Sequence, residues 1–138
     1  SMNLFDTSVL VDIDRGGVSE RVATLDDTGR HAISIVTVTE LTLGVDMQYE
    51  QGTDSHQQAR DDLDRLLARF DVFPITRPIA TKAATVIATL KQAGRQIDDL
   101  HDVYIAATAL TRSLSVVTAN VDHFERIDGV GVVDWAEL

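Results

Sequence analysis

The sequence predicts a three-layer α/β/α domain built around a mainly parallel central sheet of about five strands. Short apolar, β-branched runs alternate with longer segments in which apolar residues recur at helical spacing, a pattern typical of folds with right-handed crossovers. The 138 residues, 44% of them hydrophobic, suffice for one domain with a full core. No repeat, linker or low-complexity segment divides them. We therefore expect a single domain over residues 2–138 and treat Ser1, before Met2, as a cloning remnant.

The first half of the chain is expected to hold two strands and four helices. The first strand ends at Asp6, and Thr7 or Ser8 can cap the helix that follows. Thr37 and Glu40 have the spacing of a capping box and mark the start of a later helix. In order, the elements are strand Asn3–Phe5, helices Val9–Asp14 and Val18–Asp27, strand Ala32–Val36, a helix from Thr37 to near Gly52, and an amphipathic helix over Ser55–Phe70.

The second half is expected to hold three strands, two helices and a helical turn. Pro74 indicates that its strand lies at an edge of the sheet, because proline cannot donate to a ladder. Pro78 suits the first turn of the next helix, which Gly94 ends, and Asp98 or Asp99 can cap the helix after it. In order, the elements are strand Val72–Ile75, a helix from Pro78 to Gly94, helix Leu100–Arg112, strand Ser115–Thr118, the turn Val121–Phe124 and strand Val130–Val133.

Composition excludes several classes of protein. The net charge of −10 argues on its own against a nucleic-acid partner, because phosphate binding favours a basic surface. No apolar run approaches the ~18 residues of a transmembrane helix, and no basic segment precedes an apolar one as in a signal peptide, so we expect no membrane partner. The absence of cysteine excludes disulfides and thiolate metal sites and suits the cytoplasm.

Acidic and amide side chains follow the ends of predicted strands or lie in the first turns of predicted helices. In a parallel sheet these positions share one rim. Converging carboxylates repel one another unless a cation neutralises them, and oxygen ligands suit Mg²⁺ or Mn²⁺. The side chains are Asp6, Glu40, Asp102, Asn120 and Asp122.

Each of these residues also has a purely structural interpretation. Asp6 can serve a turn, Glu40 and Asp102 can interact with helix dipoles, and Asn120 and Asp122 can form side-chain turns. Their joint placement favours a metal site. The predicted helix around Asp102 is also apolar nearly all round, and a buried carboxylate needs a partner such as a cation.

Four segments resemble the PIN domain and, more narrowly, the VapC toxins of toxin–antitoxin pairs. The resemblance covers essentially the whole chain and implies a PIN-like fold and a metal-dependent ribonuclease. Asp6, Glu40 and Asp102 match the acidic positions of the family. The matching segments are Leu4–Ser8, Thr39–Leu41 with Gly44, Asp102–Ala107 and Val117–Phe124, and the segment through Trp135 also matches how those chains end.

The fourth acidic position of the family is open between two residues. Asp122 can complete the catalytic and metal-binding acids, or Asn120 can act through its carbonyl or a water. Thr7, Ser8 and Thr118 match positions that support the acids by hydrogen bonds.

The resemblance also implies chemistry and partners. One or two Mg²⁺ or Mn²⁺ ions would bind a scissile phosphate and activate a water. The expected substrates are loops of structured RNA, such as tRNA or ribosomal RNA. The expected partners are a cognate VapB-like antitoxin, whose tail enters the acidic groove, and a second copy of the chain in a homodimer.

Two alternatives remain at this stage. Val9–Asp14 resembles the nucleophile motif of haloacid-dehalogenase-like phosphatases, with Asp12 as nucleophile and Asp98 and Asp99 as the later acidic pair. Arg15–Gly17 departs from that motif, and the chain is short for that fold. The other alternative is a catalytically inert PIN-like binding module.

The four histidines show no i,i+4 pairing, and we expect ordinary surface or turn roles for them. Two stand beside candidate acids in the sequence and could tune the site. They are His101 and His123, and the others are His31 and His56.

Overall fold

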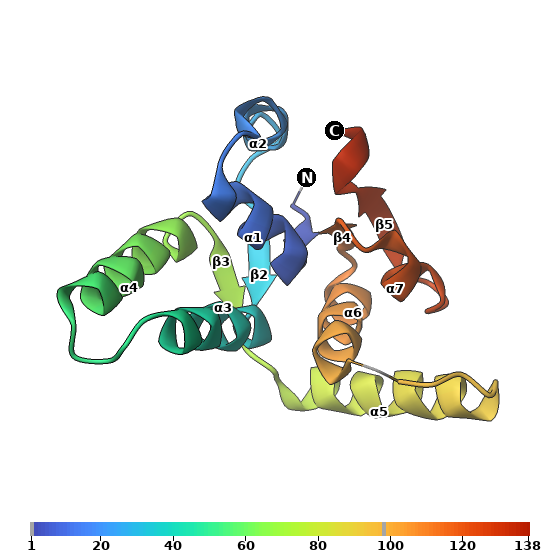
Figure 1. The fold of residues 1–138 in the computed structure, drawn as a ribbon. Helices are drawn as coiled ribbons and strands as arrows, with labels where there is room; N and C mark the ends of the chain where they lie inside the picture. The colour runs from blue at the N-terminus through green and yellow to red at the C-terminus, as the bar shows by residue number, and fades with distance from the viewer. Residues whose placement is uncertain (1, 98) are drawn as a thin grey trace.

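Five parallel strands form the central sheet of the computed structural model, which describes residues 2–97 and 99–138 (Figure 1). Their order is β3-β2-β1-β4-β5, so β1 lies in the middle and pairs in parallel with β2 and β4. The strand before Pro74 is an edge strand, as predicted. The bounds are β1 Leu4–Phe5, β2 Ala32–Ser34, β3 Asp71–Phe73, β4 Ser115–Thr118 and β5 Gly131–Asp134.

Helices cover both faces of this sheet, which confirms the predicted three-layer α/β/α architecture (Figure 1). The helices are α1 Thr7–Arg15, α2 Ser19–Asp26, α3 Ile35–Gln48, α4 Asp54–Leu67, α5 Arg77–Gln92, α6 Leu100–Arg112, α7 Val121–Glu125 and the short 3₁₀ helix η1 Trp135–Glu137. None of the helices within the described residues is both long and apolar enough to cross a membrane.

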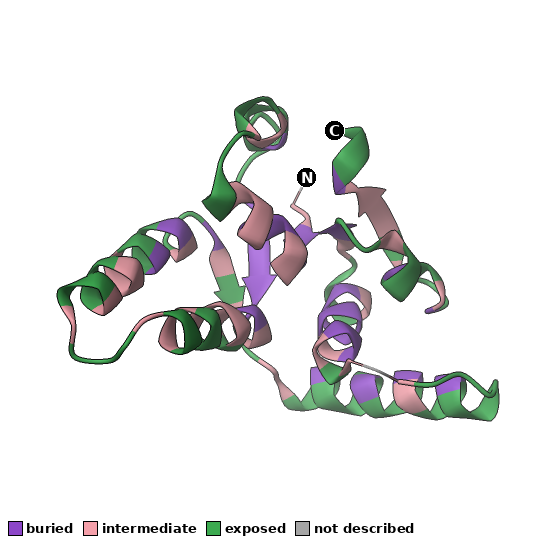
Figure 2. Cartoon of the chain, in the orientation of Figure 1, coloured by how far each residue is buried: buried purple, intermediate pink, exposed green. Residues whose placement is uncertain are grey.

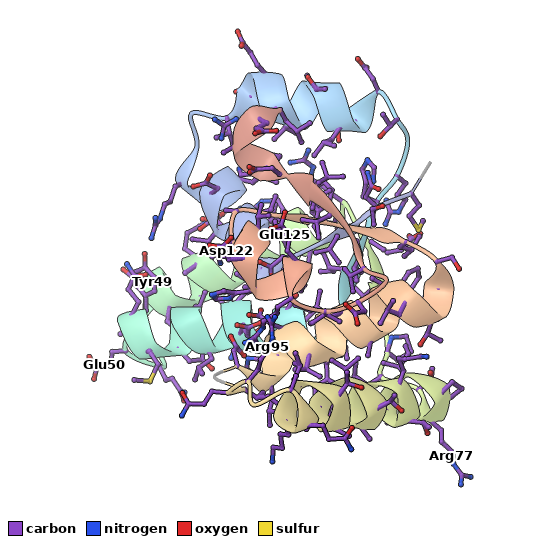
Figure 3. The ribbon with its side chains drawn as sticks, turned by 90° about the vertical axis from the view of Figure 1, so that its right-hand side faces the viewer. Tyr49, Glu50, Arg77, Arg95, Asp122 and Glu125 are labelled. Carbon is purple, nitrogen blue, oxygen red and sulfur yellow. The ribbon has the colours of Figure 1, made fainter. Side chains whose placement is uncertain are left out.

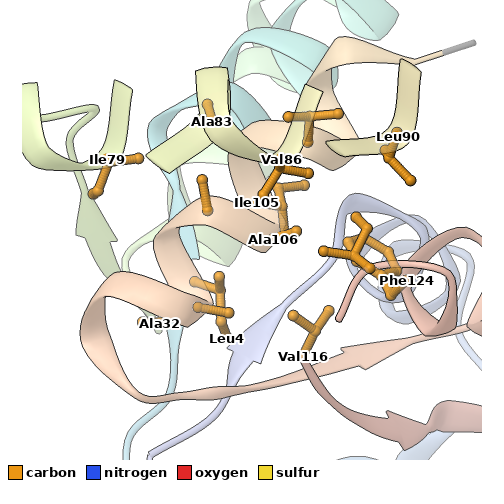
Figure 4. Close-up of a cluster of buried hydrophobic side chains, with 14 residues drawn as sticks. Leu4, Ala32, Ile79, Ala83, Val86, Leu90, Ile105, Ala106, Val116 and Phe124 are labelled. Atoms are coloured by element: carbon orange, nitrogen blue, oxygen red, sulfur yellow. The ribbon is translucent and has the colours of Figure 1, made fainter. Parts of the chain in front are cut away.

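Alternate residues of the central strands point to opposite faces and seed two apolar clusters. One cluster packs under α5, α6 and α7 (Figure 4), and the other packs under α1, α2 and α4. Burial of each large side chain contributes about 1.5–3 kcal/mol, so both faces stabilise the strand ends. The strand residues of the first cluster are Leu4, Ala32 and Val116, and those of the second are Phe5, Ile33 and Val117.

The helix α6 is the most deeply buried helix of the fold (Figure 2). Six apolar or hydroxyl side chains of α6 are buried together with Asp102, as the nearly uniform apolar sequence predicts. Asp99 caps α6 by accepting from the His101 N–H at 2.8 Å. This confirms one of the two predicted caps. Asp98, the other, lies outside the described residues.

Two predicted helix starts are wrong. The third helix begins at Ile35, and its cap is Ser34, whose Oγ accepts from the Val36 N–H at 3.1 Å. The predicted capping box of Thr37 and Glu40 therefore does not exist, and both residues lie inside the helix. The β-branched residues after Ser34 favour a strand locally, but packing against both apolar clusters makes them helical.

The first helix also begins earlier than predicted, directly after Asp6. Thr7 and Ser8 lie in its first turn, so neither is its N-cap. Their hydroxyl groups bond instead to carboxylates at the rim of the sheet. Residues interpreted as helix signals thus belong to the candidate site.

The surface or turn role predicted for His31 is also wrong. The side chain is 3% exposed and stacks on Phe5, with ring centroids 5.1 Å apart. Its Nδ1 accepts from the Asn3 N–H at 3.0 Å, so Nε2 carries the hydrogen that it donates to the Leu25 carbonyl at 2.9 Å. His31 is a core residue that joins β1 and β2 to α2.

Candidate metal and active site

Asp6 lies where β1 ends and α1 begins, and it is only 3% exposed. Its Oδ2 accepts hydrogen bonds from Ser8 Oγ at 2.7 Å and from Thr118 Oγ1 at 2.9 Å. Both bonds use the same oxygen and leave Oδ1 for another ligand. The two hydroxyls therefore orient a buried carboxylate on the rim of the sheet.

The same hydroxyls hold the turn after β4 against the start of α1. Ser8 Oγ accepts from the Ala119 N–H at 3.1 Å, and Thr118 Oγ1 accepts from the Asn120 N–H at 2.8 Å. Each hydroxyl thus joins backbone from the C-terminal part of the chain to Asp6. The segment that carries Asn120 is positioned within two hydrogen bonds of this carboxylate.

Glu40 reaches the rim from α3 and is held by Thr7 of α1. The Thr7 hydroxyl donates to Glu40 Oε1 at 2.8 Å and lies 3.0 Å from the buried hydroxyl of Thr37. Because Thr7 donates to the carboxylate, the Thr37 hydroxyl donates to Thr7. This chain of bonds fixes one oxygen of Glu40 and leaves Oε2 outside it.

Asp102 is the second buried carboxylate, 7% exposed in the first turn of α6. Its Oδ2 lies 2.7 Å from His123 Nδ1. The pKa of Asp102 is raised to about 6, chiefly by burial and also by the carboxylates of Asp6 and Asp99, although the hydrogen bond from His123 lowers it. The electrostatic coupling places Asp6, Asp99 and Asp102 in one cluster.

Asp99 and His101 extend this cluster toward Glu40. His101 Nδ1 lies 3.4 Å from Glu40 Oε2 and 3.7 Å from Asp99 Oδ1, and the three ligand atoms lie within 4.8 Å of one another. The sequence predicted Asp99 as a helix cap or, in the phosphatase alternative, as part of an acidic pair. It predicted a surface or turn role for His101, with tuning of the site as the other possibility. The signal that could have found both is their spacing, since Asp99, His101 and Asp102 share the first turn of one helix.

The donor set fits a divalent cation. Asp6, Glu40 and Asp102 each use one oxygen in the contacts above, and two of these carboxylates are buried. Buried like charges are costly, as the raised pKa of Asp102 indicates, and a cation offsets that cost. Carboxylate oxygens are the ligands that Mg²⁺ and Mn²⁺ take.

The chain is similar to known proteins over most of its length. The family model of the PIN domain matches residues 4–130. Ribonuclease VapC1 of Rickettsia felis is 30% identical, with 94% of this chain and 93% of the relative covered. Ribonuclease VapC1 of Methanocaldococcus jannaschii is 31% identical, with 94% and 83% covered. The chain belongs to the PIN domain family, and within it to the VapC ribonucleases.

A solved structure has the same fold over the whole chain. The structure of VapBC-1 from nontypeable Haemophilus influenzae superposes with a TM-score of 0.81 at 27% identity, covering 99% of both chains. The PIN fold predicted from the four sequence segments is therefore confirmed.

The fourth acidic position of the PIN site stays a prediction. Asn120 precedes α7, and Asp122 lies in its first turn (Figure 3). Both residues are exposed. Among the described residues, neither side chain forms a hydrogen bond or ion pair with the other acids. The backbone of Asn120 approaches Asp6 through Thr118, so this end of α7 borders the cluster.

The phosphatase alternative does not fit the PIN fold found here. Asp12 lies within α1 and not at the end of a strand. Its Oδ2 accepts from the indole N–H of the buried Trp135 at 2.9 Å. Asp12 therefore anchors η1 against α1, which is a structural role and not that of a nucleophile.

Beside the acidic cluster, residues of α1, α3 and α4 line a groove with a volume of about 1160 Å³. Thr7 and Glu40 line its end at the cluster. Apolar residues of the three helices line it together with acidic ones, so it suits a segment with apolar and basic side chains. The apolar lining residues are Val11, Leu41, Val45, Ala59, Leu63 and Leu66, the acidic ones beside Glu40 are Asp14, Asp54 and Asp62, and one basic residue, Arg15, lies among them.

Proposed function

We propose that the protein is a metal-dependent endoribonuclease, the toxin of a VapBC-type toxin–antitoxin pair, that cleaves structured RNA such as tRNA or ribosomal RNA in the cytoplasm. The observation that carries the proposal is the meeting of Asp6, Glu40 and Asp102 at one rim of the sheet, two of them buried. Membership of the VapC ribonucleases supports the reaction class.

In this proposal the chain's own residues bind and orient the groups that react. When bound, Mg²⁺ or Mn²⁺ would neutralise charge on the phosphate and lower the pKa of a bound water that attacks it. Asp6, Glu40 and Asp102 would hold one or two cations, with Asp122 or Asn120 completing the set. Thr118 fixes Asp6 and His123 fixes Asp102. No side chain acts as a covalent nucleophile.

Cleavage of tRNA and ribosomal RNA by the purified chain tests this function. We expect cleavage with Mg²⁺ or Mn²⁺ and none with a chelator. Asp6→Asn and Asp102→Asn should each lower the rate at least ~100-fold, because each removes a ligand charge worth several kcal/mol in the transition state. The exposed Asp27→Asn is the matched control and should keep the full rate.

Two results would separate the alternatives. Equal rates for Asp6→Asn and the unmodified chain would refute the assignment of the site. Metal binding without cleavage of any RNA offered would instead favour the inert binding module.

We further propose that the groove between α1, α3 and α4 receives the tail of a VapB-like antitoxin, and that the toxin forms a homodimer. The solved relative is a VapBC complex by its name. The apolar and acidic lining predicts a tail with apolar side chains and at least one Lys or Arg that approaches Glu40.

Gly44 offers a test of the groove. It lines the groove on α3, and a Cβ built there meets nothing within 4 Å, so a larger side chain enters the groove without a clash. Gly44→Arg should weaken antitoxin binding at least ~10-fold in calorimetry and leave the free energy of unfolding unchanged or higher, because glycine is a poor helix former. Unchanged affinity for the antitoxin would place its tail elsewhere.

A further inference from the structure

His101 presents one imidazole nitrogen to two carboxylates of different helices. Its Nδ1 lies 3.4 Å from Oε2 of Glu40 on α3 and 3.7 Å from Oδ1 of Asp99 at the start of α6. Both distances exceed the 2.7–3.2 Å of a normal N–H···O hydrogen bond. The nitrogen is therefore near two oxygens without being bonded to either.

The other histidine at the site behaves differently. His123 Nδ1 lies 2.7 Å from Asp102 Oδ2, which is a strong hydrogen bond. This distance is that of a hydrogen bond and is shorter than the about 3.0 Å between neighbouring ligands of an octahedral ion at ~2.1 Å, so it indicates a direct bond between the two groups. His123 is thus a positioning residue for Asp102, and His101 is free of that role.

The spacing around His101 matches one coordination sphere. With ligand distances of ~2.1 Å, neighbouring ligand atoms are about 3.0 Å apart in an octahedron and about 3.4 Å apart in a tetrahedron, and opposite ones about 4.2 Å apart. The three atoms of Glu40, Asp99 and His101 all lie within 4.8 Å of one another. The two distances from His101 Nδ1, 3.4 Å to Glu40 and 3.7 Å to Asp99, lie within the range that one coordination sphere spans.

The surroundings hold these ligands in place and keep them accessible. Thr7 binds Oε1 of Glu40, so Oε2 is the oxygen that faces His101, and Asp99 is held by its cap bond to the backbone of α6. The side chain of Glu40 is 25% exposed and that of His101 is 45% exposed. A hydrated cation can therefore enter, and waters or a phosphate can complete its sphere.

We propose that His101 is a nitrogen ligand of the divalent cation, together with Glu40 and Asp99, and that it makes the site bind Mn²⁺ in preference to Mg²⁺. This inference rests on the proposed metal-dependent function and names its metal. Imidazole is a good ligand for transition metals, whereas Mg²⁺ prefers oxygen ligands and retains its waters.

Electron paramagnetic resonance of the Mn²⁺-loaded full chain, without RNA, tests the assignment directly. A ¹⁴N coupling to Mn²⁺ is expected in the unmodified protein and should be absent in His101→Ala. Because the first measurement needs no variant, a folding defect in His101→Ala would not leave the question open. A Mn²⁺ signal without nitrogen coupling, or a coupling that persists in His101→Ala, would overturn the proposal.

Calorimetric titration with each metal measures the preference for Mn²⁺ over Mg²⁺. His101→Ala should weaken Mn²⁺ binding at least ~10-fold and Mg²⁺ binding less than ~3-fold, because only the transition metal loses a favoured ligand. His56→Ala is the matched control, since His56 lies on α4 bonded to Asp46 and away from the cluster, and it should bind Mn²⁺ normally. Equal losses for both metals would also overturn the proposal.

The outcomes distinguish this inference from the function it rests on. Mn²⁺ binding without a role for His101 leaves the proposed metal-dependent ribonuclease intact. Failure of the unmodified chain to bind either metal at millimolar concentration would refute both. RNA cleavage with Mg²⁺ that survives in His101→Ala agrees with both.

Discussion

Asp6 and Asp102 are both buried carboxylates, but their surroundings differ. Two hydroxyl groups donate to Asp6, from Ser8 and Thr118. Asp102 has His123 on one oxygen, and its burial and the neighbouring carboxylates still raise its pKa to about 6. The electrostatic free energy of placing these carboxylates together therefore destabilises the charged form of Asp102 most. Removal of the charge of Asp102 should have the clearest effect on the stability of the protein.

Asp102→Asn should stabilise the metal-free protein at neutral pH. The pKa of Asp102 is about 6 in the fold against 3.8 as its ordinary value, so the folded state binds this proton more tightly than the unfolded state. The contribution of Asp102 to stability is greatest below pH 4 and is lost as the pH rises through 6. The variant should therefore gain at most ~3 kcal/mol in free energy of unfolding at pH 7 and little at pH 4.

Urea unfolding at pH 4 and pH 7 with a chelator present measures this difference. The exposed Asp27→Asn serves as the control and should track the unmodified chain. Added Mn²⁺ should stabilise the unmodified protein more than Asp102→Asn. A variant less stable than the unmodified chain at pH 7 would contradict this account of the cluster.

At the scale of elements, the start of α1 connects strand β1, helix α3 and the turn after β4. Thr7 bonds to Glu40 and Thr37 of α3, and Ser8 bonds to Asp6 and to the backbone of Ala119. A single helical turn thus sets the relative positions of carboxylates from two elements. The arrangement explains how hydrogen bonds hold a site assembled from distant segments in one geometry.

Thr7→Val should destabilise the fold and loosen Glu40. Valine has nearly the shape of threonine, but it leaves the Thr37 hydroxyl, which is fully buried, without its partner, at a cost of about 1–3 kcal/mol. Chemical denaturation measures this loss, and Thr7→Ser should restore most of it. Thr24→Val is the control, because Thr24 bonds only to its own exposed helix. Equal effects of the two valine variants would show that the α1–α3 link is unimportant.

The same elements mark where the sequence is informative and where it is not. Apolar patterning predicted all five strands and the buried helix around Asp102, because these depend on local periodicity. Pro74 predicted the edge position of its strand, because proline lacks the N–H that a ladder needs. It misplaced the starts of α1 and α3, because Thr7 and Ser8 look like caps locally. Their actual acceptors include Glu40, 33 residues away from Thr7.

As with the fold, the sequence predicted the part of the candidate site that depends on local order and missed the part that depends on distant contacts. Acids at strand ends and helix starts can be identified from order alone. The structure couples Asp102 to Asp6 and places Glu40 beside Asp99, and the role of these acids as ligands stays a prediction. The roles of His31 and His101 depend on contacts between segments far apart in the chain, which a single sequence does not contain. His31 is buried against Phe5, and His101 faces Glu40.

At the scale of the whole molecule, a net charge of −10 opposes the RNA substrate that the site is proposed to bind. Ordinary nucleic-acid-binding proteins neutralise phosphates with Lys and Arg and release counterions. The chain has 12 basic against 22 acidic residues, so its overall field repels RNA. The bound cation would then be the main electrostatic link between protein and phosphate.

This balance predicts a weak dependence of RNA binding on salt. A protein that makes 6–10 phosphate contacts loses about 10³–10⁵ in affinity between 50 and 200 mM salt. For this chain at saturating Mn²⁺, added NaCl also screens the repulsion between protein and RNA, so KM for RNA should change less than ~10-fold over that range. Cleavage kinetics at fixed Mn²⁺ and increasing NaCl measure this. A rise in KM of ~100-fold or more would reveal a basic surface patch that binds the RNA backbone and would move the main electrostatic contact away from the metal site.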